Sequence, residues 1–293
     1  MRKQTVENIH HRFLGTTLLF GALSLLAGSF SATAAGRISH ADRKWLFISE
    51  DNSEINSSKI CDPSVFRIAL DIGHTIQASG ATSARGVTEH TFNINLAAVI
   101  AQSLQDAGFR NTYLLTTTGT GIRQLEERTT RANALGVDLL LSIHHDDVQP
   151  TYYSTWEYDG KRYHFSDRFS GYSIFVSYEN RHRENSLAFA KLLGDQLLAR
   201  GLHFNLEHAE NIPGENRELV DPKRGVYRYD QLFVLRNSVA PAALLEAGVI
   251  TNRDEEVLLS SSERKAKIGA AIVAAASQFC SEIQGKTIHS DKN

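Results

Sequence analysis

The segment Phe66-Arg-Ile-Ala-Leu-Asp-Ile-Gly-His74 is the part of the sequence on which the fold prediction depends. A short apolar run rich in Ile and Leu is typical of a buried strand, and Gly73 ends the run. The chain therefore brings His74 to the carboxyl end of a strand. Ligands of open α/β sheets bind just outside these ends, which makes His74 a candidate site residue. A lone His after Gly is also common in turns, so the interpretation needs support from other strands.

Two further predicted strands end at polar side chains in the same way. Residues 138–143 are mostly apolar and run into His144, and residues 242–245 run into Glu246. The carboxyl ends of parallel strands meet at one edge of a sheet. We therefore expect these side chains to lie close to His74.

Helical patterns alternate with the strands. Between residues 89 and 107, Phe92, Leu96 and Ile100 recur every four positions, as in an amphipathic helix packed on a sheet. The alternation predicts the α/β class, with a single domain whose mostly parallel sheet is covered by helices on both faces. Further helices are predicted over residues 122–135, 185–200 and 268–283, and further strands over 111–117 and 171–178.

The first 35 residues have the pattern of a secretory signal peptide. Arg2, Lys3 and Arg12 form a positive region, an apolar stretch follows, and Ala32-Thr33-Ala34 is a small-x-small cleavage signal. An uncleaved membrane anchor is the alternative, because the apolar stretch approaches the ~20 residues that span a bilayer. We expect an exported protein with no membrane-spanning segment after cleavage.

The rest of the chain suits one domain. Residues 36–62 are polar and without periodicity, which predicts a linker, residues 63–285 form the predicted domain, and residues 286–293 a disordered tail. Loss of the leader changes the formal net charge from −2 to −4, because three basic residues and one acidic residue leave with it. A charge of this sign excludes the basic surface typical of nucleic-acid binding.

The two cysteines, Cys61 and Cys280, stand at opposite ends of the predicted domain. In an exported protein they can form one disulfide that closes the domain. The alternative is two unpaired small hydrophobic residues, since Cys280 follows Phe279 in a predicted helix. Sequence leaves both readings open.

Two long segments interrupt the alternation of strands and helices. Residues 150–170 are rich in aromatic side chains, and residues 201–230 contain several Pro and Gly. Connections of this length in a compact domain are usually lids or binding loops. We expect each segment to form a wall of a cleft, with a plain surface insertion as the alternative.

His74, Glu89 and His144 are candidate metal ligands. Two imidazoles and a carboxylate are the ligand mix of catalytic zinc sites that keep a fourth position open to water. Glu89 also has an ordinary explanation, because acidic residues are favoured in the first turn of a helix. His145 competes with His144, but alternation along the strand allows only one of the two to face His74. The spacing contains no compact metal motif, so it leaves the metal site open.

Five motifs follow one another along the chain: Asp71-Ile-Gly-His74, Gly86-Val-Thr-Glu89, Leu125-Glu-Glu-Arg128 with Ala132-Asn133, Ser142-Ile-His144-His-Asp146 and Glu246-Ala-Gly-Val-Ile-Thr-Asn252. Together they resemble the zinc-dependent N-acetylmuramoyl-L-alanine amidases that trim bacterial peptidoglycan, the amidase-3 group. The resemblance covers roughly residues 66–283 and implies one α/β domain with a twisted sheet flanked by helices.

The resemblance implies that His74, Glu89 and His144 bind one Zn²⁺ and that Glu246 is the catalytic carboxylate. The metal would activate water and polarise the amide carbonyl, and Glu246 would pass a proton to the departing L-alanine nitrogen. The implied substrate is peptidoglycan, and the implied location is the periplasm or another part of the cell envelope. We expect four further residues to contact the substrate or to support the site: His145, Asp146, Arg128 and Arg236.

The chain departs from the family pattern at three positions. Ile72 stands where Pro is usual, His90 replaces a Lys or Arg, and His145 replaces a small residue. His145 is therefore kept as a second candidate ligand. For Glu246 the alternative role is a buried structural carboxylate paired with Arg128 or Arg236.

Other functions use the same residues. A zinc peptidase or carboxypeptidase that cuts within the stem peptide needs the same metal and base. A wall-binding protein without turnover would need a missing ligand or a missing Glu246, and all four residues are present. Some relatives carry an insertion that covers the zinc and is moved by a protein activator, so a lid and an activator are hypotheses for this chain.

Overall fold

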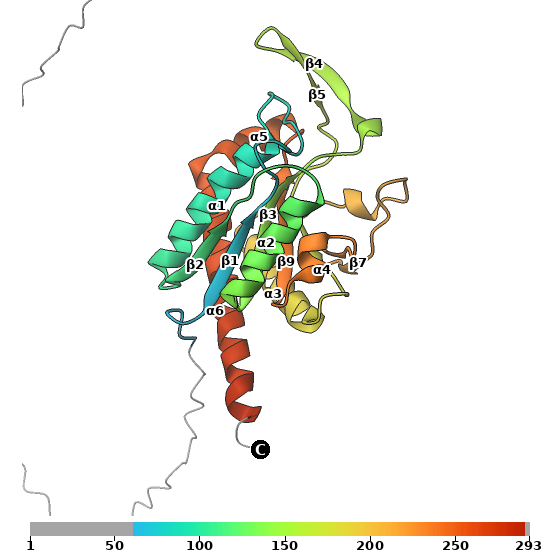
Figure 1. The fold of residues 1–293 in the computed structure, drawn as a ribbon. Coiled ribbons are helices and arrows are strands. Elements are labelled where there is room, and N and C mark those ends of the chain that lie inside the picture. The colour runs from blue at the N-terminus through green and yellow to red at the C-terminus, as the bar shows by residue number, and fades with distance from the viewer. Residues whose placement is uncertain (1–60, 291–293) are drawn as a thin grey trace, which may run out of the picture. The chain divides into compact units, whose positions relative to one another are not determined.

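The computed structural model describes residues 61–290, and for residues 286–290 it describes the backbone alone. The predicted signal peptide and residues 36–60 of the predicted linker lie outside the described residues. The described part forms a seven-stranded sheet in the order β2-β1-β3-β9-β6-β8-β7 and a separate two-stranded ribbon of β4 and β5 (Figure 1).

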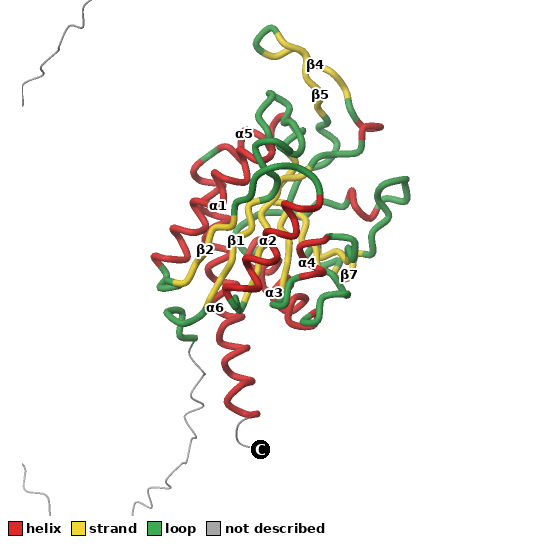
Figure 2. The backbone as a smooth tube through the Cα atoms, viewed as in Figure 1, coloured by secondary structure: helices red, strands yellow, loops and turns green. Residues whose placement is uncertain are grey.

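The first half of the sheet is parallel. Strand β1 (Arg67–Ile72) lies between β2 (Asn111–Leu115) and β3 (Leu139–Asp146), and β3 pairs with β9 (Ala242–Val249). Every residue of β1 after the first is buried, which explains why this strand is almost wholly apolar. Loops lie at both ends of these strands, and the ribbon of β4 and β5 extends beyond one of the ends (Figure 2).

The second half of the sheet is mixed. Strand β6 (Ser173–Val176) is antiparallel to β9 and parallel to β8 (Val226–Arg228), and β7 (Leu219–Asp221) is antiparallel to β8. Strands β7 and β8 belong to the segment 201–230, for which no strand was predicted. At three residues each, they are too short to show a hydrophobic period.

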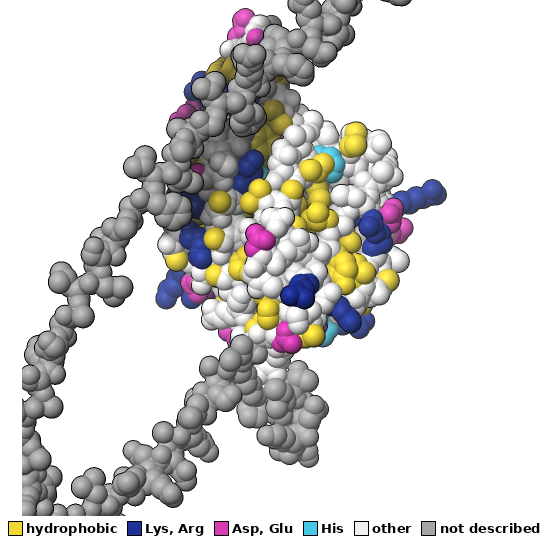
Figure 3. Space-filling model, turned by 90° about the vertical axis from the view of Figure 1, so that its left-hand side faces the viewer, with side chains coloured by type: hydrophobic (Ala, Val, Ile, Leu, Met, Phe, Trp, Pro, Cys, Tyr) yellow, Lys and Arg dark blue, Asp and Glu magenta, His cyan; other side chains and the backbone are white. Residues whose placement is uncertain are grey.

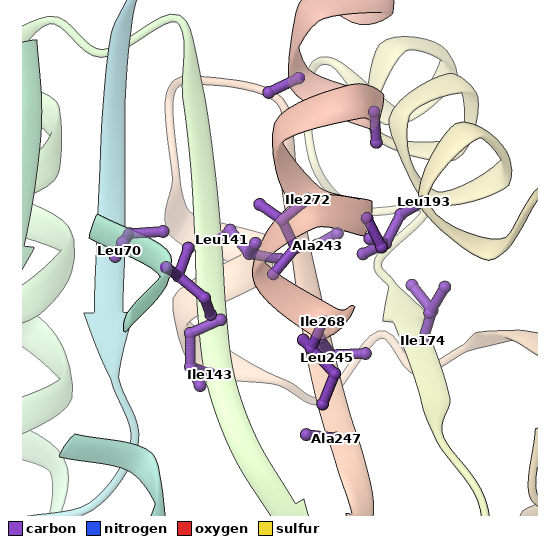
Figure 4. Close-up of a cluster of buried hydrophobic side chains, with 14 of the residues drawn as sticks. Leu70, Leu141, Ile143, Ile174, Leu193, Ala243, Leu245, Ala247, Ile268 and Ile272 are labelled. Atoms are coloured by element: carbon purple, nitrogen blue, oxygen red, sulfur yellow. The ribbon is translucent and has the colours of Figure 1, made fainter. Parts of the chain in front are cut away.

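Helices α1 (Glu89–Asp106), α3 (Arg183–Leu198) and α6 (Ser262–Ser290) cover one face of the sheet. Figure 4 shows part of the core between this face and the helices, where Leu141 and Leu245 of the sheet meet Ile272 of α6 and Leu193 of α3. Helix α5 (Arg253–Ser260) follows β9 and is capped by Asn252, whose side chain accepts hydrogen bonds from the backbone N–H groups of Asp254 and Glu255.

The opposite face carries α2 (Ile122–Leu135) and the short α4 (Phe233–Asn237). Their apolar side chains form a second, smaller core with Leu140, Ala242 and Leu244 of the sheet. The α/β class with a mostly parallel sheet and helices on both faces is therefore confirmed.

The aromatic segment 150–170 forms a ribbon that projects from the body of the domain (Figure 1). It contains a 3₁₀ turn, η1 (Pro150–Tyr152), and the antiparallel strands β4 (Ser154–Tyr158) and β5 (Lys161–Phe165). A second 3₁₀ turn, η2 (Glu207–Ala209), lies in the segment 201–230.

Three elements are longer than predicted. Strand β3 continues through His144 to Asp146, and β9 continues through Glu246, because the two strands pair with each other beyond the predicted ends. Helix α6 continues through residues 286–290, where a disordered tail was predicted. No helix among the described residues is both long and apolar enough to cross a bilayer.

A disulfide joins Cys61 to Cys280, so the start of the domain is bonded to α6. The backbone N–H groups of Cys61 and Asp62 also donate to the side chains of Ser281 and Gln284 on the same helix.

Basic and acidic side chains are interspersed on the face shown in Figure 3.

Candidate metal centre and active site

The structure brings His74, Glu89 and His144 together. The Nε2 atom of His74 lies 2.8 Å from Glu89 Oε2, and the Nδ1 atom of His144 lies 2.9 Å from Glu89 Oε1. One donor atom from each residue lies within 4.8 Å of the others. Three segments far apart in the sequence therefore place two imidazoles and a carboxylate around one point.

His74 follows β1 and has a left-handed backbone conformation, with φ of 66°. Such a conformation is costly for a residue other than Gly and persists only where its surroundings hold it. Arg128 of α2, which is buried, donates hydrogen bonds to the carbonyl oxygens of His74 and Ile72 and pairs with Asp71 at 3.0 Å. Arg128 thus supports the turn that presents His74.

Two glycines lie in van der Waals contact with the cluster. A Cβ atom on Gly73 would lie 2.4 Å from the Nε2 atom of His144, and one on Gly80 would lie 2.3 Å from Glu89 Oε2. Gly80 also has a φ of 75°, which Gly adopts without steric cost. Only residues without a side chain leave room for the three candidate ligands at these positions.

Behind the cluster, a buried polar network joins α1 to β1 and β3. The His90 ring and the Asn93 amide both bond to the carbonyl oxygen of Gly73, at 2.9 and 3.2 Å. Asn93 Nδ2 also lies 3.4 Å from Glu89 Oε1, and its Oδ1 atom lies 2.7 Å from His145 Nδ1. His90 and His145 thus belong to one network that holds Glu89.

His145 lies on the opposite side of β3 from His144, as strand alternation predicts. Its ring packs against Phe92 of α1, and burial lowers the pKa of His145 to about 3, so the ring is neutral. The structure therefore places His145 behind the cluster and not among the three candidate ligands.

The Glu89 carboxylate receives several hydrogen bonds. Besides the two imidazoles, the backbone N–H groups of Ala81 and His145 donate to it, at 3.1 and 3.3 Å. Burial raises the pKa of Glu89, but the hydrogen bonds from His144 and His74 outweigh burial, so the pKa lies well below its ordinary value. Glu89 is therefore an ionised carboxylate, as a metal ligand must be.

Glu246 lies in β9 directly beside His144 of β3 in the parallel register. Residues that pair in this way point to the same face of the sheet, here the face that carries α2 and α4. The Oε2 atom of Glu246 is buried, and among the described residues it has no hydrogen-bond partner. Burial raises the pKa of Glu246 well above its ordinary value, and the neighbouring carboxylates of Asp146 and Glu89 raise it further.

The arginines proposed as structural partners of Glu246 pair with other carboxylates. Arg128 pairs with Asp71, and Arg236 lies on the exposed side of α4, 3.7 Å from Glu179. The structure thus gives Arg128 a supporting position and places Arg236 away from the cluster.

A charged network lies on the other side of Glu246, in the segment 201–230. The buried His208 ring bonds through Nε2 to Asp146 at 2.7 Å and through Nδ1 to Glu215 at 2.8 Å, and Arg217 pairs with Glu215. His208, Glu215 and Arg217 were not predicted, because no motif or spacing distinguishes them. The only signal in the sequence was the unusual length of the segment that contains them.

Two cavities open beside the cluster. One has a volume of 320 Å³ and is lined by His74, His144 and apolar side chains between α2 and α4. The other has a volume of 180 Å³ and is lined by Glu246 and by charged side chains that include Asp146, His208 and Arg217. The prediction that segment 201–230 forms a cleft wall is thus confirmed for His208 and Arg217.

The ribbon of β4 and β5 packs against the loop that precedes Glu89. Trp156 Nε1 donates to the carbonyl oxygen of Ala84 at 2.7 Å, and the Arg85 guanidinium lies over the Trp156 ring at 5.2 Å. At the base of the ribbon, Arg253 lies 3.9 Å from the centre of the Phe165 ring and pairs with Asp167. The aromatic segment therefore braces this loop.

The donor set fits a single divalent ion such as Zn²⁺. Two imidazoles and one carboxylate converge, glycines clear the space around them, and hydrogen bonds orient Glu89 from behind. Outer hydrogen bonds of this kind are usual around metal ligands.

Comparison with known proteins agrees with this geometry. Residues 68–278, more than half of the chain, match the family model described as N-acetylmuramoyl-L-alanine amidase. A search of curated proteins gives no match.

Among solved structures, the fold is similar to the amidase Ami1 from Mycobacterium smegmatis, with 21% identity, a TM-score of 0.56 and coverage of 75% of this chain and 99% of that chain. It is also similar to the catalytic domain of CwlV from Bacillus (Paenibacillus) polymyxa var. colistinus, with 22% identity, a TM-score of 0.52 and coverage of 73% and 97%. A third similar structure is the CwlD amidase from Clostridioides difficile in complex with the GerS lipoprotein, with 16% identity, a TM-score of 0.52 and coverage of 74% and 98%.

At these identities the solved structures show a shared fold, and the family model covers the segment that holds both cavities and all four candidate residues. The chain belongs to the N-acetylmuramoyl-L-alanine amidase family.

Proposed function

We propose that this protein hydrolyses the amide bond between N-acetylmuramic acid and L-alanine in peptidoglycan, with one Zn²⁺ held by His74, Glu89 and His144. The observation that carries the proposal is the position of Glu246. A buried carboxyl oxygen without a hydrogen-bond partner lies beside a His, Glu, His cluster, in the register position next to His144. Unsatisfied buried polar atoms are rare and need an explanation, which catalysis supplies here.

When bound, the metal supplies Lewis-acid polarisation of the amide carbonyl and acidifies a water molecule. The chain's own residues perform the remaining tasks. Asn93 and the backbone of Ala81 hold the Glu89 carboxylate, and Arg128 holds the turn of His74. Glu246 takes a proton from water and delivers it to the departing L-alanine nitrogen. Its raised pKa suits a group that must both accept and release a proton.

We further propose that the protein is exported to the periplasm or another part of the cell envelope. The signal-peptide pattern of residues 1–35 and the peptidoglycan substrate of the family support this location. A protein activator is a second hypothesis. Its support is one similar structure, that of CwlD, which is a complex with a lipoprotein.

The test is the Glu246→Ala variant of the mature protein, with Glu218→Ala as a matched control, because Glu218 is an exposed glutamate outside both cavities. We expect Glu246→Ala to slow hydrolysis of purified sacculi by at least ~10²-fold, since general acid–base catalysis contributes about 10²–10⁴-fold. Zinc content, measured by atomic absorption, stays at one ion per chain in both variants. His74→Ala is expected to lose the zinc.

Product analysis separates the proposal from its alternatives. Glycan with free lactyl groups and intact peptides that begin with L-alanine indicate an amidase. Shortened stem peptides would instead assign the protein to the peptidases. Unchanged lysis of the wall by Glu246→Ala would contradict any catalytic role for this residue.

A further inference from the structure

The two cavities beside the candidate metal centre differ in chemical character. The larger one is lined mainly by apolar side chains, and its charged residues Asp71 and Arg128 pair with each other. It also contains His74 and His144, and its apolar residues include Leu125, Leu232, Phe233, Leu235 and Leu244. The smaller one contains Glu246 and ionisable groups of both signs, Asp146, Asp147, His208, Glu215 and Arg217. Leu232 and Leu244 line both cavities, so the two adjoin each other along the same face of the sheet.

The proposed reaction also has two different sides. Hydrolysis forms a bond from the water oxygen to the carbonyl carbon and breaks the bond from that carbon to nitrogen. One water proton travels through Glu246 to the departing nitrogen. The group that protonates the leaving nitrogen has to lie within hydrogen-bond reach of it. The half of the substrate that departs as an amine must therefore start on the Glu246 side of the site.

We infer that the site binds its substrate in one direction: the acyl half, the lactyl group with its sugar, occupies the apolar cavity between α2 and α4, and the departing peptide occupies the charged cavity beside Glu246. This inference rests on the proposed function and assigns a binding role to Phe233 and Arg217, neither of which carries a sequence motif. It specifies which half of the substrate each residue contacts.

The lining of the apolar cavity suits the acyl half. The lactyl methyl group, the N-acetyl methyl group and the C–H faces of a sugar bury favourably against apolar and aromatic side chains. Phe233 begins α4 and is half-buried, so part of its ring remains free for contact. Gln124 and Gln231 supply polar groups in the same cavity.

The charged cavity offers the carboxyl groups of Asp146, Asp147, Glu215 and Glu246 to the amide N–H groups of a peptide, and the guanidinium of Arg217 to a carboxylate. Arg217 is held from two sides, by the Glu215 carboxylate and by the Tyr229 ring at 4.3 Å. Its Nε atom is buried, and within the described part of the chain it has no hydrogen-bond partner. The fork of an Arg guanidinium matches a carboxylate in geometry and charge. A carboxylate of the stem peptide is therefore the group that Arg217 would recognise.

The experiment compares two substrates with the zinc-loaded mature enzyme: N-acetylmuramoyl-L-alanine amide, whose departing half carries no carboxylate, and N-acetylmuramic acid that carries a full stem peptide. Phe233→Ala removes a contact to the half that both substrates share, so we expect kcat/KM to fall about tenfold for both. Arg217→Gln removes a contact to the extended peptide, so we expect kcat/KM to fall about tenfold for the long substrate and less than twofold for the short one.

Two matched variants serve as controls. Asn237→Ala changes a residue of α4, and Arg228→Gln changes a partly exposed arginine that pairs with Asp230. Neither residue lines either cavity. Both are expected to leave the two kcat/KM values unchanged. Thermal unfolding of every variant identifies one that fails to fold, and for such a position Phe233→Leu and Arg217→Lys are measured instead, with the same selectivity expected at reduced size.

Each result has a defined meaning. An Arg217 variant that affects both substrates equally, or a Phe233 variant that affects neither, overturns the direction of binding. A wild-type enzyme that cleaves both substrates with the same kcat/KM overturns the role of the charged cavity. If the wild type hydrolyses purified sacculi but neither substrate, the two cavities do not suffice for binding and the inference is overturned. If it hydrolyses none of the three, the proposed function itself is wrong, and that failure is seen before any variant is made.

Discussion

Close approach of the backbone shapes the candidate metal centre as much as the ligands do. Gly80 contacts the side chains of Glu89 and His74, and Gly73 contacts that of His144. A Cβ atom on either glycine would lie less than 3.0 Å from these side chains. His74 itself is held at a positive φ by the carbonyl bonds from Arg128. The ligands are therefore oriented by neighbours that carry no metal-binding group of their own.

Gly80→Ala is expected to weaken zinc binding at least ~10-fold, because its Cβ would displace the Glu89 carboxylate and the His74 ring. The matched control is Gly160→Ala at the tip of the β4–β5 ribbon. Gly160 has a similar φ, 70° against 75°, but nothing lies within 4 Å of its Cβ position. Competition with a chelator measures the zinc affinity of both variants. If Gly80→Ala and Gly160→Ala lost zinc affinity equally, backbone strain alone would explain the loss.

The β4–β5 ribbon depends on the rest of the domain. Two strands in isolation are marginally stable in water. Here Trp156 and its cross-strand partner Tyr163 face the loop that precedes Glu89, and Arg85 of this loop lies over the Trp156 ring. A Cβ atom on Gly86 would lie 2.4 Å from the Tyr163 ring. The ribbon thus supports the loop that leads to Glu89, whereas the lid hypothesis requires the ribbon to obstruct the site.

Replacement of residues 154–165 by two glycines is expected to lower the rate of sacculus hydrolysis several-fold and to weaken zinc binding, because the loop before Glu89 loses its packing. Exchange of Asp159 for Asn at the tip is the control, since Asn-Gly forms the same kind of turn. A rise in the hydrolysis rate after the replacement would support the lid.

The segment 201–230 is fastened to the sheet through His208. Burial lowers the pKa of His208, but Asp146 and Glu215 outweigh burial and raise it to about 10. Because the pKa is raised from 6.5 on folding, the charged ring stabilises the fold fully below pH 6.5, and this contribution is lost as the pH rises through about 10.

His208→Gln is expected to lower the free energy of unfolding by about 3 kcal/mol at pH 6, the order of magnitude for breaking a buried ion pair. The difference from the wild type should shrink steadily between pH 6.5 and pH 10. Urea unfolding at pH 6, 8 and 10 measures it, and the exposed His164→Gln is the control. A difference that is constant with pH would exclude a charged His208 as its source.

The disulfide between Cys61 and Cys280 closes a loop with a sequence separation of 219 residues. In the chain-entropy model such a loop stabilises the fold by roughly 5 kcal/mol. Cys61→Ser together with Cys280→Ser is therefore expected to lower Tm by roughly 10 °C. Calorimetry of the double variant and of the reduced wild type checks this, and an unchanged Tm in both would show that the disulfide does not limit unfolding.

Local pattern was sufficient for the elements that carry the candidate ligands. The apolar run before His74 predicted the strand that the structure shows as β1. The period of four between Phe92 and Ile100 predicted the helix that the structure shows as α1, which begins at Glu89. The spacing of apolar residues along an element indicates which of its faces is buried, and both elements are buried on the face that their spacing indicates. The ordered motifs then sufficed for the family, because each contributes a residue to the same edge of the sheet.

Contacts between distant segments lay beyond such patterns. Three such contacts depend on how loops fold back over the sheet. His208 bonds to Asp146, Arg217 borders the cavity of Glu246, and the aromatic segment braces the loop before Glu89. Loops have no hydrophobic period, and their side chains find partners only once the strands are in register. The sequence alone thus identified the candidate ligands and the elements that build the core, namely strands β1, β2, β3, β6 and β9 and helices α1, α2, α3 and α6. Folding in three dimensions supplied the two cavities and the charges that surround Glu246.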